Sequence, residues 1–365
     1  MQISSVTNLS FKGKIIDSHV HLGKWGTSYY APESLDIFIN SKLSNGDTVE
    51  KMIVSNSSCI DNDGILDELT GNKQMLDFAS KNSKIAPLAV CQPKLTNGNA
   101  ANIDKLLQEN PQKFVGLKFH PKCMELPAND SAYDSYMDVA QKYKLPCLFH
   151  TDKTFSVTYS DGSIGAKCEY SRPEQVYELA KRHKDVPVIF AHMGGNEGDN
   201  TKAAVDIILD SIENNSAKVY ADISWVNAED SYKRDIVEAV KRLKNTSKGD
   251  MTDRLLFGTD APIGRFGNNG ENGIPPYSAY SKVVDDIKNS IKSAFSADEA
   301  NEIIDKIFYR NAYNLFFSEK DTQTSEIKAV SKTNKKVYAY TAVIIALLSA
   351  LGVLLKNKLS KSADK

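Results

Sequence analysis

The sequence predicts an α/β protein: a (β/α)8 barrel of the TIM-barrel class, followed by a single transmembrane helix. Eight short apolar runs alternate with amphipathic stretches between residues 14 and 318, which is the pattern of repeated βα units. The runs are apolar throughout, as expected of parallel strands that are buried on both faces. Near the end of the chain, residues 337–355 contain no charged residue.

The apolar runs define the expected strands. In chain order they read KIIDSHVH, KMIVSNS, KIAPLAV, FVGLKFH, LPCLFH, VPVIFAH, KVYADIS and RLLFGTD. Segments of helical period lie between them, for example NIDKLLQEN and PEQVYELAKRHK. Eight such units in roughly 300 residues fit a closed barrel better than an open doubly wound sheet. No GxGxxG or P-loop follows any strand, so nothing indicates a nucleotide-binding Rossmann domain.

The predicted barrel, residues 14–318, has a short segment before it and a polar one after it. Residues 1–13 form a lead-in without the apolar centre of a secretory signal. Helices around 297–317 are expected to close the barrel, with Asp298 and Glu299 near a helix start, where the helix dipole favours acidic residues. Residues 319–336 are rich in Lys, Ser and Thr and are expected to be a linker.

The uncharged segment that follows the linker reads VYAYTAVIIALLSALGVLL. Nineteen helical residues span roughly 28 Å, about the hydrocarbon thickness of a bilayer. A buried terminal helix is the alternative, but it would usually keep a polar stripe, and here only Thr341 and Ser349 are polar. We therefore expect residues 337–355 to anchor the barrel to a membrane from its cytoplasmic side, with residues 356–365 as a short basic tail.

Charge and cysteine content exclude several classes of protein. A formal net charge of −1 over 365 residues argues against a nucleic-acid-binding surface. The five cysteines form no CxxC pair, so we expect reduced thiols in the cytosol, not a disulfide framework or a zinc knuckle. The expected partners are a small-molecule substrate and the membrane, and a homodimer is compatible with the sequence.

Most histidines stand where such a barrel places its chemistry. Five of the six lie at expected strand ends: His19, His21, His120, His150 and His192. Lys118 shares a strand face with His120, and Asp260 ends the last strand. Because active sites of these barrels form at the carboxyl ends of the strands, we expect these side chains to meet. His183 lies in a charged helical stretch and is expected on the solvated surface.

Clustered imidazoles with one carboxylate indicate a catalytic metal site. A divalent ion takes imidazole nitrogen and carboxylate oxygen and leaves one position open for water. The ion lowers the pKa of that water and polarises a substrate carbonyl. Asp260 could accept the proton and pass it to the leaving group. Asp17 lies on the same strand face as His19, and it is either a hydrogen-bond partner of a ligand or a residue that holds the barrel floor.

These motifs, taken in order, resemble a known family. HVH after the first strand, GLKFHP, PCLFHTD, VIFAHMGG, and FGTDAP followed by IFYRNAYNLF resemble the amidohydrolase superfamily, and most closely its amidohydrolase-related branch of metal-dependent TIM-barrel hydrolases and decarboxylases. The resemblance covers roughly residues 14–318. It implies that a divalent ion, usually zinc or manganese, is held by four residues: His19, His21, His150 and Asp260. His192 would be a further ligand or a positioned acid or base.

The resemblance leaves the number of metal ions open. In binuclear members a carbamylated lysine at the position of Lys118 bridges two ions, and His150 and His192 would hold the second. In mononuclear members this position lines the substrate pocket. We expect one ion, with Lys118 and His120 in contact with substrate; a surface location for Lys118 is the simpler alternative.

Other polar residues of the expected loops are weaker candidates for substrate binding. They are Lys24, Trp25, Arg172 and Arg265. A pocket arginine would indicate a carboxylate-bearing substrate, although each of these residues could simply be solvated. The segment Met193-Gly194-Gly195 allows a sharp turn after the sixth strand and is assigned no chemistry.

Three functions remain open from the sequence. The leading one is a metal-dependent hydrolase that acts on a small amide, lactone or ester through a metal-activated water. The second is a non-oxidative decarboxylase of a small aromatic or unsaturated carboxylate on the same scaffold. The third is a membrane-tethered binding or scaffold barrel without catalysis. That third function predicts a lost ligand, whereas no ligand position is missing here.

Overall fold

The computed structural model describes the chain from residue 13 to 318 with short gaps. The described ranges are 13–26, 28–40, 43, 45–60, 66–94, 98–152, 157–158, 164–165, 168–195, 198–225, 230–263 and 277–318. The chain divides into two compact units, Met1–Phe316 and Phe317–Lys365, and the account below concerns the first. The predicted linker, membrane helix and basic tail lie outside the described residues. Among the described residues, no helix is both long and apolar enough to cross a membrane.

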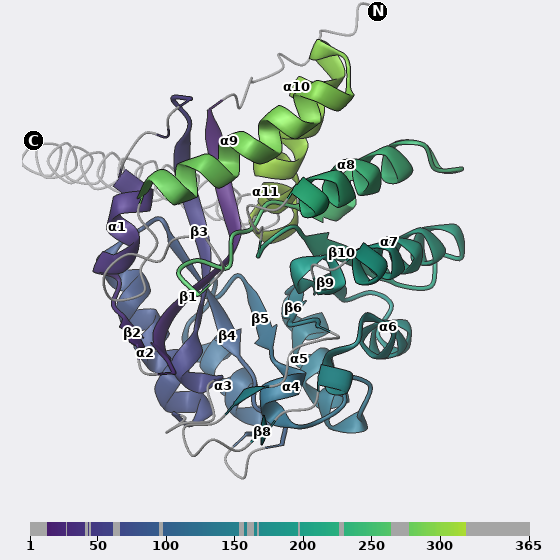
Figure 1. The fold of residues 1–365 in the computed structure, drawn as a ribbon. Coiled ribbons are helices and arrows are strands. Elements are labelled where there is room, and N and C mark those ends of the chain that lie inside the picture. Colours follow the sequence, from purple (N-terminus) through teal and green to yellow (C-terminus); the bar gives the residue numbers. More distant parts are fainter. Residues whose placement is uncertain are drawn as a thin grey trace, which may run out of the picture. The chain divides into compact units, whose positions relative to one another are not determined.

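The centre of the first unit is a nine-stranded sheet in the order β11-β10-β9-β6-β5-β4-β3-β1-β2 (Figure 1). Its eight parallel strands are β1 (Lys14–Trp25), β3 (Thr48–Asn56), β4 (Ile85–Val90), β5 (Gly116–Phe119), β6 (Cys147–Phe149), β9 (Pro187–Phe190), β10 (Lys218–Asp222) and β11 (Leu255–Leu256). Each expected strand is thus found. The sequence did not predict β2 (Ser28–Tyr30), antiparallel to the end of β1, or the hairpin of β7 (Val157–Thr158) and β8 (Ile164–Gly165).

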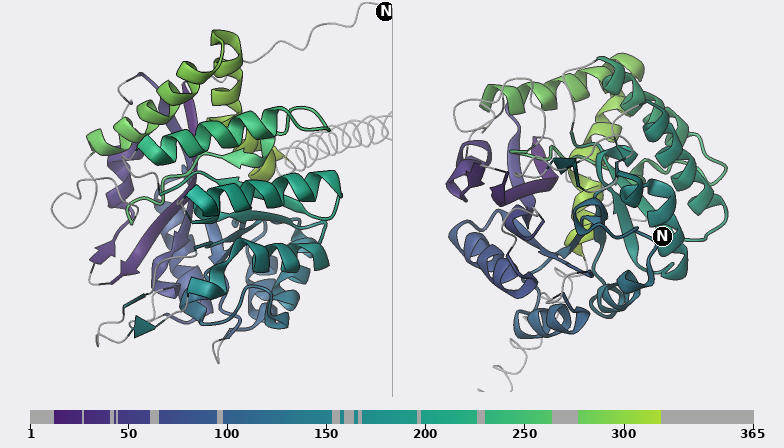
Figure 2. Two further views of the ribbon diagram at one scale, coloured as in Figure 1. Left: turned by 45° about the vertical axis from the view of Figure 1, so that its right-hand side comes forward. Right: turned by 60° about the horizontal axis from the view of Figure 1, so that its bottom comes forward.

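The sheet curls until the segment that follows its last parallel strand reaches the first strand. Past the end of β11, the chain exchanges backbone hydrogen bonds with β1: Ser18 N donates to Phe257 O (2.9 Å), His21 N to Ala261 O (2.7 Å) and Asp260 N to His19 O (2.8 Å). The molecule therefore has an α/β fold with a curled parallel sheet. Helices surround this sheet, as the right-hand view of Figure 2 shows.

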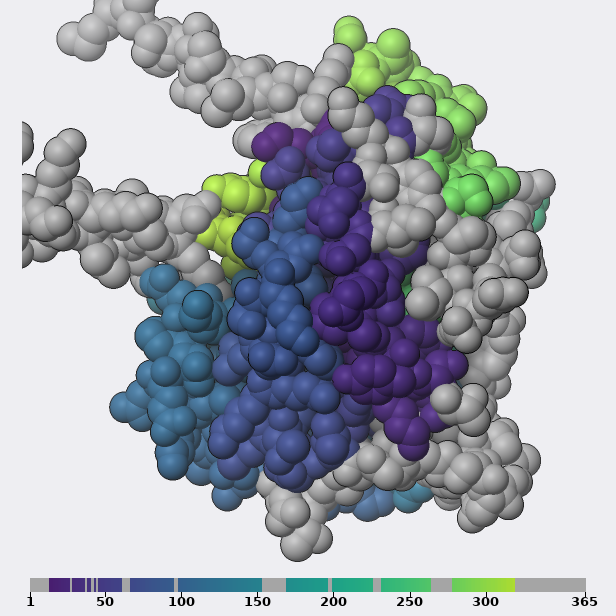
Figure 3. Space-filling model, turned by 90° about the vertical axis from the view of Figure 1, so that its left-hand side faces the viewer, coloured from purple at the N-terminus to yellow at the C-terminus, as the bar shows by residue number. Residues whose placement is uncertain are grey.

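The outer helices alternate with the strands. They are α1 (Glu33–Asn40), α2 (Glu68–Lys81), α3 (Ala100–Glu109), α4 (Pro121–Met124), α5 (Asp134–Tyr143), α6 (Pro173–Arg182), α7 (Gly198–Glu213), α8 (Asp230–Lys244) and α9 (Tyr277–Ala294). Their starts follow simple rules. The Asp67 side chain accepts hydrogen bonds from two backbone amides in the first turn of α2, and Pro173 occupies the first turn of α6. Successive stretches of the chain lie side by side on the face shown in Figure 3, as the order of its colours shows.

The helices predicted around 297–317 are also present. They are α10 (Ala297–Asp305), a π-helical turn (Lys306–Arg310) and α11 (Asn311–Phe316). Asp298 and Glu299 lie in the first turn of α10, as predicted. The Asn311 side chain donates to the Leu255 carbonyl at the start of β11, and Phe316 lies near Gly116 at the start of β5. The last helix therefore crosses the amino-terminal ends of the strands.

The core lies inside the curled sheet and between the sheet and its helices. All six residues of β4 and all four of β5 are buried, as expected of strands covered on both faces. Phe119 stacks on Phe149 inside the sheet, with ring centroids 4.5 Å apart. The described cysteines whose side chains can be followed are buried free thiols, as predicted: Cys59, Cys91, Cys123 and Cys147.

Candidate metal centre

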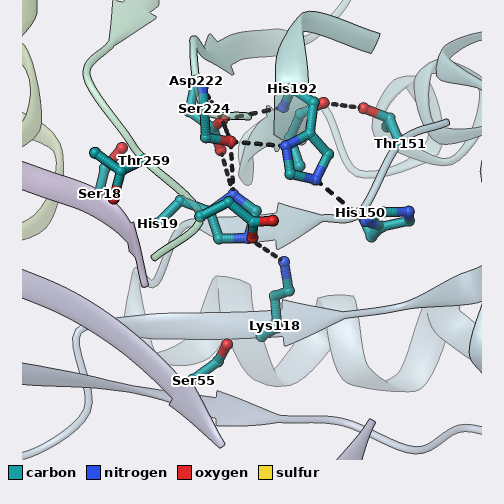
Figure 4. Close-up of polar contacts among 12 residues, drawn as sticks. Ser18, His19, Ser55, Lys118, His150, Thr151, His192, Asp222, Ser224 and Thr259 are labelled. Carbon is teal, nitrogen blue, oxygen red and sulfur yellow. Dashed lines mark hydrogen bonds and ion pairs between the residues drawn. The ribbon is translucent and has the colours of Figure 1, made fainter. Parts of the chain in front are cut away.

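The predicted site residues meet at the carboxyl ends of the strands, and Figure 4 shows four of them together: His19, Lys118, His150 and His192. His19 and His21 lie in β1, Lys118 in β5, and Asp260 follows β11. His120 directly follows β5, His150 directly follows β6, and His192 lies in the short turn Ala191–Gly194 after β9. All seven side chains are buried. Lys118 is fully buried, so the alternative of a surface lysine is wrong.

Three of these side chains point one atom each at a common point. His19 Nε2 lies 3.1 Å from His21 Nε2, and Asp260 Oδ1 lies 3.3 Å from the first nitrogen and 3.0 Å from the second. Ligand atoms of a tetrahedral zinc ion with bonds of about 2.0–2.1 Å lie about 3.3 Å apart. Both the donor types and their spacing therefore fit a divalent metal ion.

His192 and His150 form a second pair beside this triangle. His192 belongs to a set with His19 and Asp260 in which one donor atom from each residue lies within 4.8 Å of the others. His192 Nε2 also faces His150 Nδ1 at 3.3 Å. The ring of His150 also stacks on that of His120 at 3.9 Å, and its Nε2 lies 3.6 Å from Asp152 Oδ2. The predicted ligand His150 adjoins His192 and not the triangle itself.

Burial controls the protonation of the cluster. It lowers the pKa of His150 to about 3 and that of His192 to about 4, so both rings are neutral near pH 7. Burial would raise the pKa of Asp260, but the facing imidazoles of His19 and His192 hold it well below its usual range. Neutral imidazoles and an ionised carboxylate are the states that bind a metal ion.

Lys118 faces the triangle from β5. Its Nζ lies 2.8 Å from His19 Nε2. Burial lowers the pKa of Lys118 to about 8, although the nearby carboxylates of Asp260 and Asp222 partly oppose this shift. A buried amine with a pKa near neutrality is typical of functional sites.

Comparison with known families identifies the chain. The amidohydrolase family model matches residues 86–317. The chain belongs to the amidohydrolase family. The matched range begins in β4, so it leaves out β1 with His19 and His21. No curated protein matches the sequence.

Solved structures share this amidohydrolase fold. An amidohydrolase from Burkholderia multivorans with bound zinc is 13% identical, with a TM-score of 0.53 over 83% of this chain and 98% of that chain. A probable 2-pyrone-4,6-dicarboxylic acid hydrolase from Acinetobacter baumannii with citric acid bound is 15% identical (TM-score 0.50, 83% and 98%). The 5-carboxyvanillate decarboxylase from Sphingomonas paucimobilis is 11% identical (TM-score 0.50, 83% and 99%). At such identities the similarity establishes the fold alone.

Asp17 holds the seam of the amidohydrolase sheet. Its carboxylate accepts hydrogen bonds from Thr259 Oγ1 (2.6 Å), Thr259 N (3.0 Å) and Tyr280 OH (3.0 Å). It also accepts from the backbone amide of His19 (3.3 Å). Burial raises the pKa of Asp17 to about 7. Of the two roles left open by the sequence, these contacts favour the structural one.

Several residues of the site were not predicted. Asp222 and Ser224, at the end of β10, contact the imidazole of His19. Ser55 Oγ lies 2.9 Å from His21 Nδ1. Behind His150, the buried carboxylate of Asp152 accepts a hydrogen bond from Lys122 Nζ at 2.6 Å. The motif ADIS does place two polar residues on one face at the end of the seventh strand, which is the signal that could have identified the first two.

The weaker candidates lie at different distances from the cluster. Trp25 approaches the His120 ring at 6.1 Å. Lys24 is half-buried beside it, and Arg172 is exposed at the start of α6. Arg265 lies outside the described residues. The predicted solvated location of His183 is wrong.

His183 is instead half-buried against α5. Its Nε2 lies 2.8 Å from Asp134 Oδ1.

The predicted sharp turn after β9 is present, with a φ of +57° at His192 and +47° at Met193. Asp260 also has a positive φ, of +63°. Positive φ at residues other than glycine is uncommon and concentrates at functional sites.

Proposed function

We propose that this amidohydrolase is a metal-dependent hydrolase that acts on a small amide, lactone or ester. The observation that carries the proposal is the buried triangle of His19 Nε2, His21 Nε2 and Asp260 Oδ1, with sides of 3.0–3.3 Å. It lies at the carboxyl ends of the strands, where barrels of this class place their active sites. The zinc bound by the structural neighbour from Burkholderia multivorans also supports it.

We further propose that the curled sheet is the complete (β/α)8 TIM barrel predicted for residues 14–318.

The proposed roles follow from the contacts. His19, His21 and Asp260 would hold one divalent ion, zinc or manganese, which when bound polarises a carbonyl and lowers the pKa of a water. The ionised carboxylate of Asp260 accepts a proton and later returns it to the leaving group. His192 provides a neutral ring nitrogen beside the triangle, as a further ligand or an acid or base.

The remaining predicted residues would line the substrate site. Lys118 offers hydrogen-bond donors to the reacting group, and His120 lies between Trp25 and the ring of His150. A second ion would require the His150–His192 pair, whose facing nitrogens are 3.3 Å apart, together with a carbamylated Lys118. We propose one ion because the triangle is the tighter set of donors.

Elemental analysis of the purified full chain tests the proposal. We expect one zinc or manganese ion per chain, and turnover of a panel of small esters, lactones and amides that a chelator abolishes and the metal restores. The absence of a bound transition ion, together with activity that is indifferent to chelators, would contradict it. Two ions per chain would support the binuclear alternative.

Decarboxylation of a small aromatic or unsaturated carboxylate is the second candidate. Two indole rings beside the histidines favour it, because aromatic rings are suited to stacking on a planar substrate. Trp225 meets the His192 ring edge-on at 5.1 Å, and Trp25 lies 6.1 Å from the His120 ring. Product analysis separates the two reactions, since only decarboxylation releases CO2.

We also propose that residues 337–355 anchor the enzyme to a membrane, with the barrel in the cytoplasm. The uncharged composition of this segment supports the proposal. Helix α11 ends at Phe316, near the amino-terminal ends of the strands. Three exposed lysines precede neighbouring strands at these ends, Lys113, Lys144 and Lys184, and a fourth exposed lysine, Lys218, is the first residue of β10. Each basic residue near an anionic lipid surface contributes about 1 kcal/mol of attraction.

A further inference from the structure

The end of β10 lies between two histidines that come from different strands. Asp222 Oδ2 is 3.0 Å from His19 Nδ1, and Ser224 Oγ is 2.8 Å from His192 Nδ1 and 3.1 Å from His19 Nδ1 (Figure 4). All four side chains are essentially inaccessible to solvent. Each ring therefore presents Nδ1 to β10 and leaves Nε2 for the proposed metal site.

The hydrogen bonds of Ser224 fix the proton on His192. The Ser224 hydroxyl has one proton, which it donates to Asp222 Oδ1. Asp222 Oδ1 also accepts from the backbone amides of His192 and Ser224, both at 3.0 Å. Because an ionised carboxylate can only accept, Ser224 Oγ must accept from the ring of His192. His192 therefore carries its proton on Nδ1, and its Nε2 holds a lone pair.

Two contacts on opposite sides of the ring fix the proton on His19. Asp222 Oδ2 can only accept, so His19 Nδ1 donates to it. On the other side Lys118 Nζ lies 2.8 Å from His19 Nε2. A neutral imidazole that donates from Nδ1 accepts at Nε2, and Lys118 Nζ is placed to donate to it. The Lys118 contact therefore fits the tautomer that the Asp222 contact requires.

We infer that Asp222 and Ser224 act as one positioning unit that sets the tautomers of His19 and His192 together. With Nδ1 protonated on both rings, the lone pair of His19 Nε2 faces His21 and Asp260, and that of His192 Nε2 faces His150. His19 contacts Asp222 directly at 3.0 Å and Ser224 Oγ at 3.1 Å, whereas His192 depends on Asp222 through the Ser224 hydroxyl. His21 has a separate partner, Ser55. The expected effect on metal affinity rests on the proposed function, while the tautomers themselves do not.

Two substitutions separate the parts of this unit. Ser224→Ala removes the acceptor of His192 but leaves the carboxylate for His19. Asp222→Asn removes the obligate acceptor and is expected to alter both rings. Ser18→Ala is the matched control, because Ser18 is a buried serine next to His19 whose hydroxyl donates to the Phe257 carbonyl (2.6 Å) and not to an imidazole. Circular dichroism and thermal unfolding establish that each variant folds.

The first measurement is the ¹⁵N chemical shift of the ring nitrogens in metal-free full-length protein at pH 7.5. We expect protonated Nδ1 and unprotonated Nε2 on His19 and His192 in the wild type and in Ser18→Ala. In Ser224→Ala we expect His192 to become a mixture of tautomers while His19 keeps its own. The inference is overturned if the wild type carries its protons on Nε2, or if folded Ser224→Ala leaves His192 unchanged.

The second measurement is zinc affinity by competition with a chromophoric chelator. Loss of an outer partner of a metal-binding histidine typically lowers affinity about 10–100-fold, and we expect this loss in Asp222→Asn, which removes the carboxylate partner of the proposed ligand His19, but less than a twofold change in Ser18→Ala. Equal affinities in the two variants would also overturn the inference. A wild type that binds no zinc, yet shows the expected tautomers, would instead contradict the proposed function and leave the assignment of the protons intact.

Discussion

Removing the charge of Lys122 tests whether the pair behind His150 is a fixed part of the site. Lys122 Nζ lies 2.6 Å from Asp152 Oδ2, and both side chains are almost fully buried. Lys122→Met keeps most of the side-chain volume and leaves the Asp152 carboxylate without this cation. Breaking a buried ion pair from one side costs about 3–5 kcal/mol, because the remaining charge stays desolvated.

The chain contains a matched control for this substitution. Lys142 Nζ lies 2.7 Å from Asp104 Oδ1, almost the same distance, but its side chain is 56% exposed. Exposed pairs contribute about 0–1 kcal/mol, so Lys142→Met is expected to have little effect. The two variants differ mainly in the burial of the pair, so their difference measures what burial contributes.

Urea and thermal unfolding of the full chain give the result. We expect Lys122→Met to lower the unfolding free energy by about 3–5 kcal/mol and the melting temperature by about 6–10 °C, at roughly 2 °C per kcal/mol for a domain of this size. Lys142→Met should lower the melting temperature by at most about 2 °C. Equal losses in the two variants would refute the reasoning, because they would show that burial of the Lys122 pair has no energetic consequence.

Three further predictions concern catalysis, pH dependence and the membrane anchor. Asp260→Asn keeps the side-chain volume but removes the proton acceptor, so turnover should fall by at least about 10²-fold while circular dichroism stays unchanged; normal turnover would exclude Asp260 from the mechanism. Burial raises the pKa of Asp17 to about 7 in the fold, so its contribution to stability is fully present below about pH 4 and is lost as the pH rises toward 7, by up to about 4 kcal/mol. The unfolding free energy of Asp17→Asn relative to the wild type should therefore increase between pH 4.5 and 7.5, and a constant difference would contradict the shift. Deleting residues 334–365 should release an active enzyme from membranes in a sedimentation assay, and continued sedimentation or loss of the fold would show that the anchor is wrongly assigned.

The sequence predicted the parallel strands well because their signal is local. Each buried strand is a short apolar run, and its burial on both faces makes the run continuous. The strands that were missed are short and form between loop segments: β2 (Ser28–Tyr30) and the β7–β8 hairpin (Val157–Thr158 with Ile164–Gly165). Such strands exist because a neighbouring segment pairs with them, and their own residues carry no periodic pattern.

The positions of the histidines could be predicted, but their grouping could not. Strand ends are visible in the sequence, so the convergence of His19, His21 and Asp260 followed from the barrel that the sequence predicts. Which nitrogen faces which partner depends on side-chain geometry, and here His150 pairs with His192 at 3.3 Å. His183 shows the same limit, since its partner Asp134 lies 49 residues earlier on α5 and is brought near only by packing.

The metal centre and the closure of the sheet depend on the same hydrogen bonds. The backbone amide of Asp260 donates to the His19 carbonyl at 2.8 Å, so the ladder that joins the last segment to β1 also places the carboxylate beside the two β1 imidazoles. Asp17 reinforces this seam through Thr259, one residue before Asp260. Because the donors come from both sides of the seam, their spacing of 3.0–3.3 Å can form only once the sheet has closed. The fold therefore creates the site as a consequence of closure, and a ligand set split between residues 19 and 260 carries no signal at short range in the sequence.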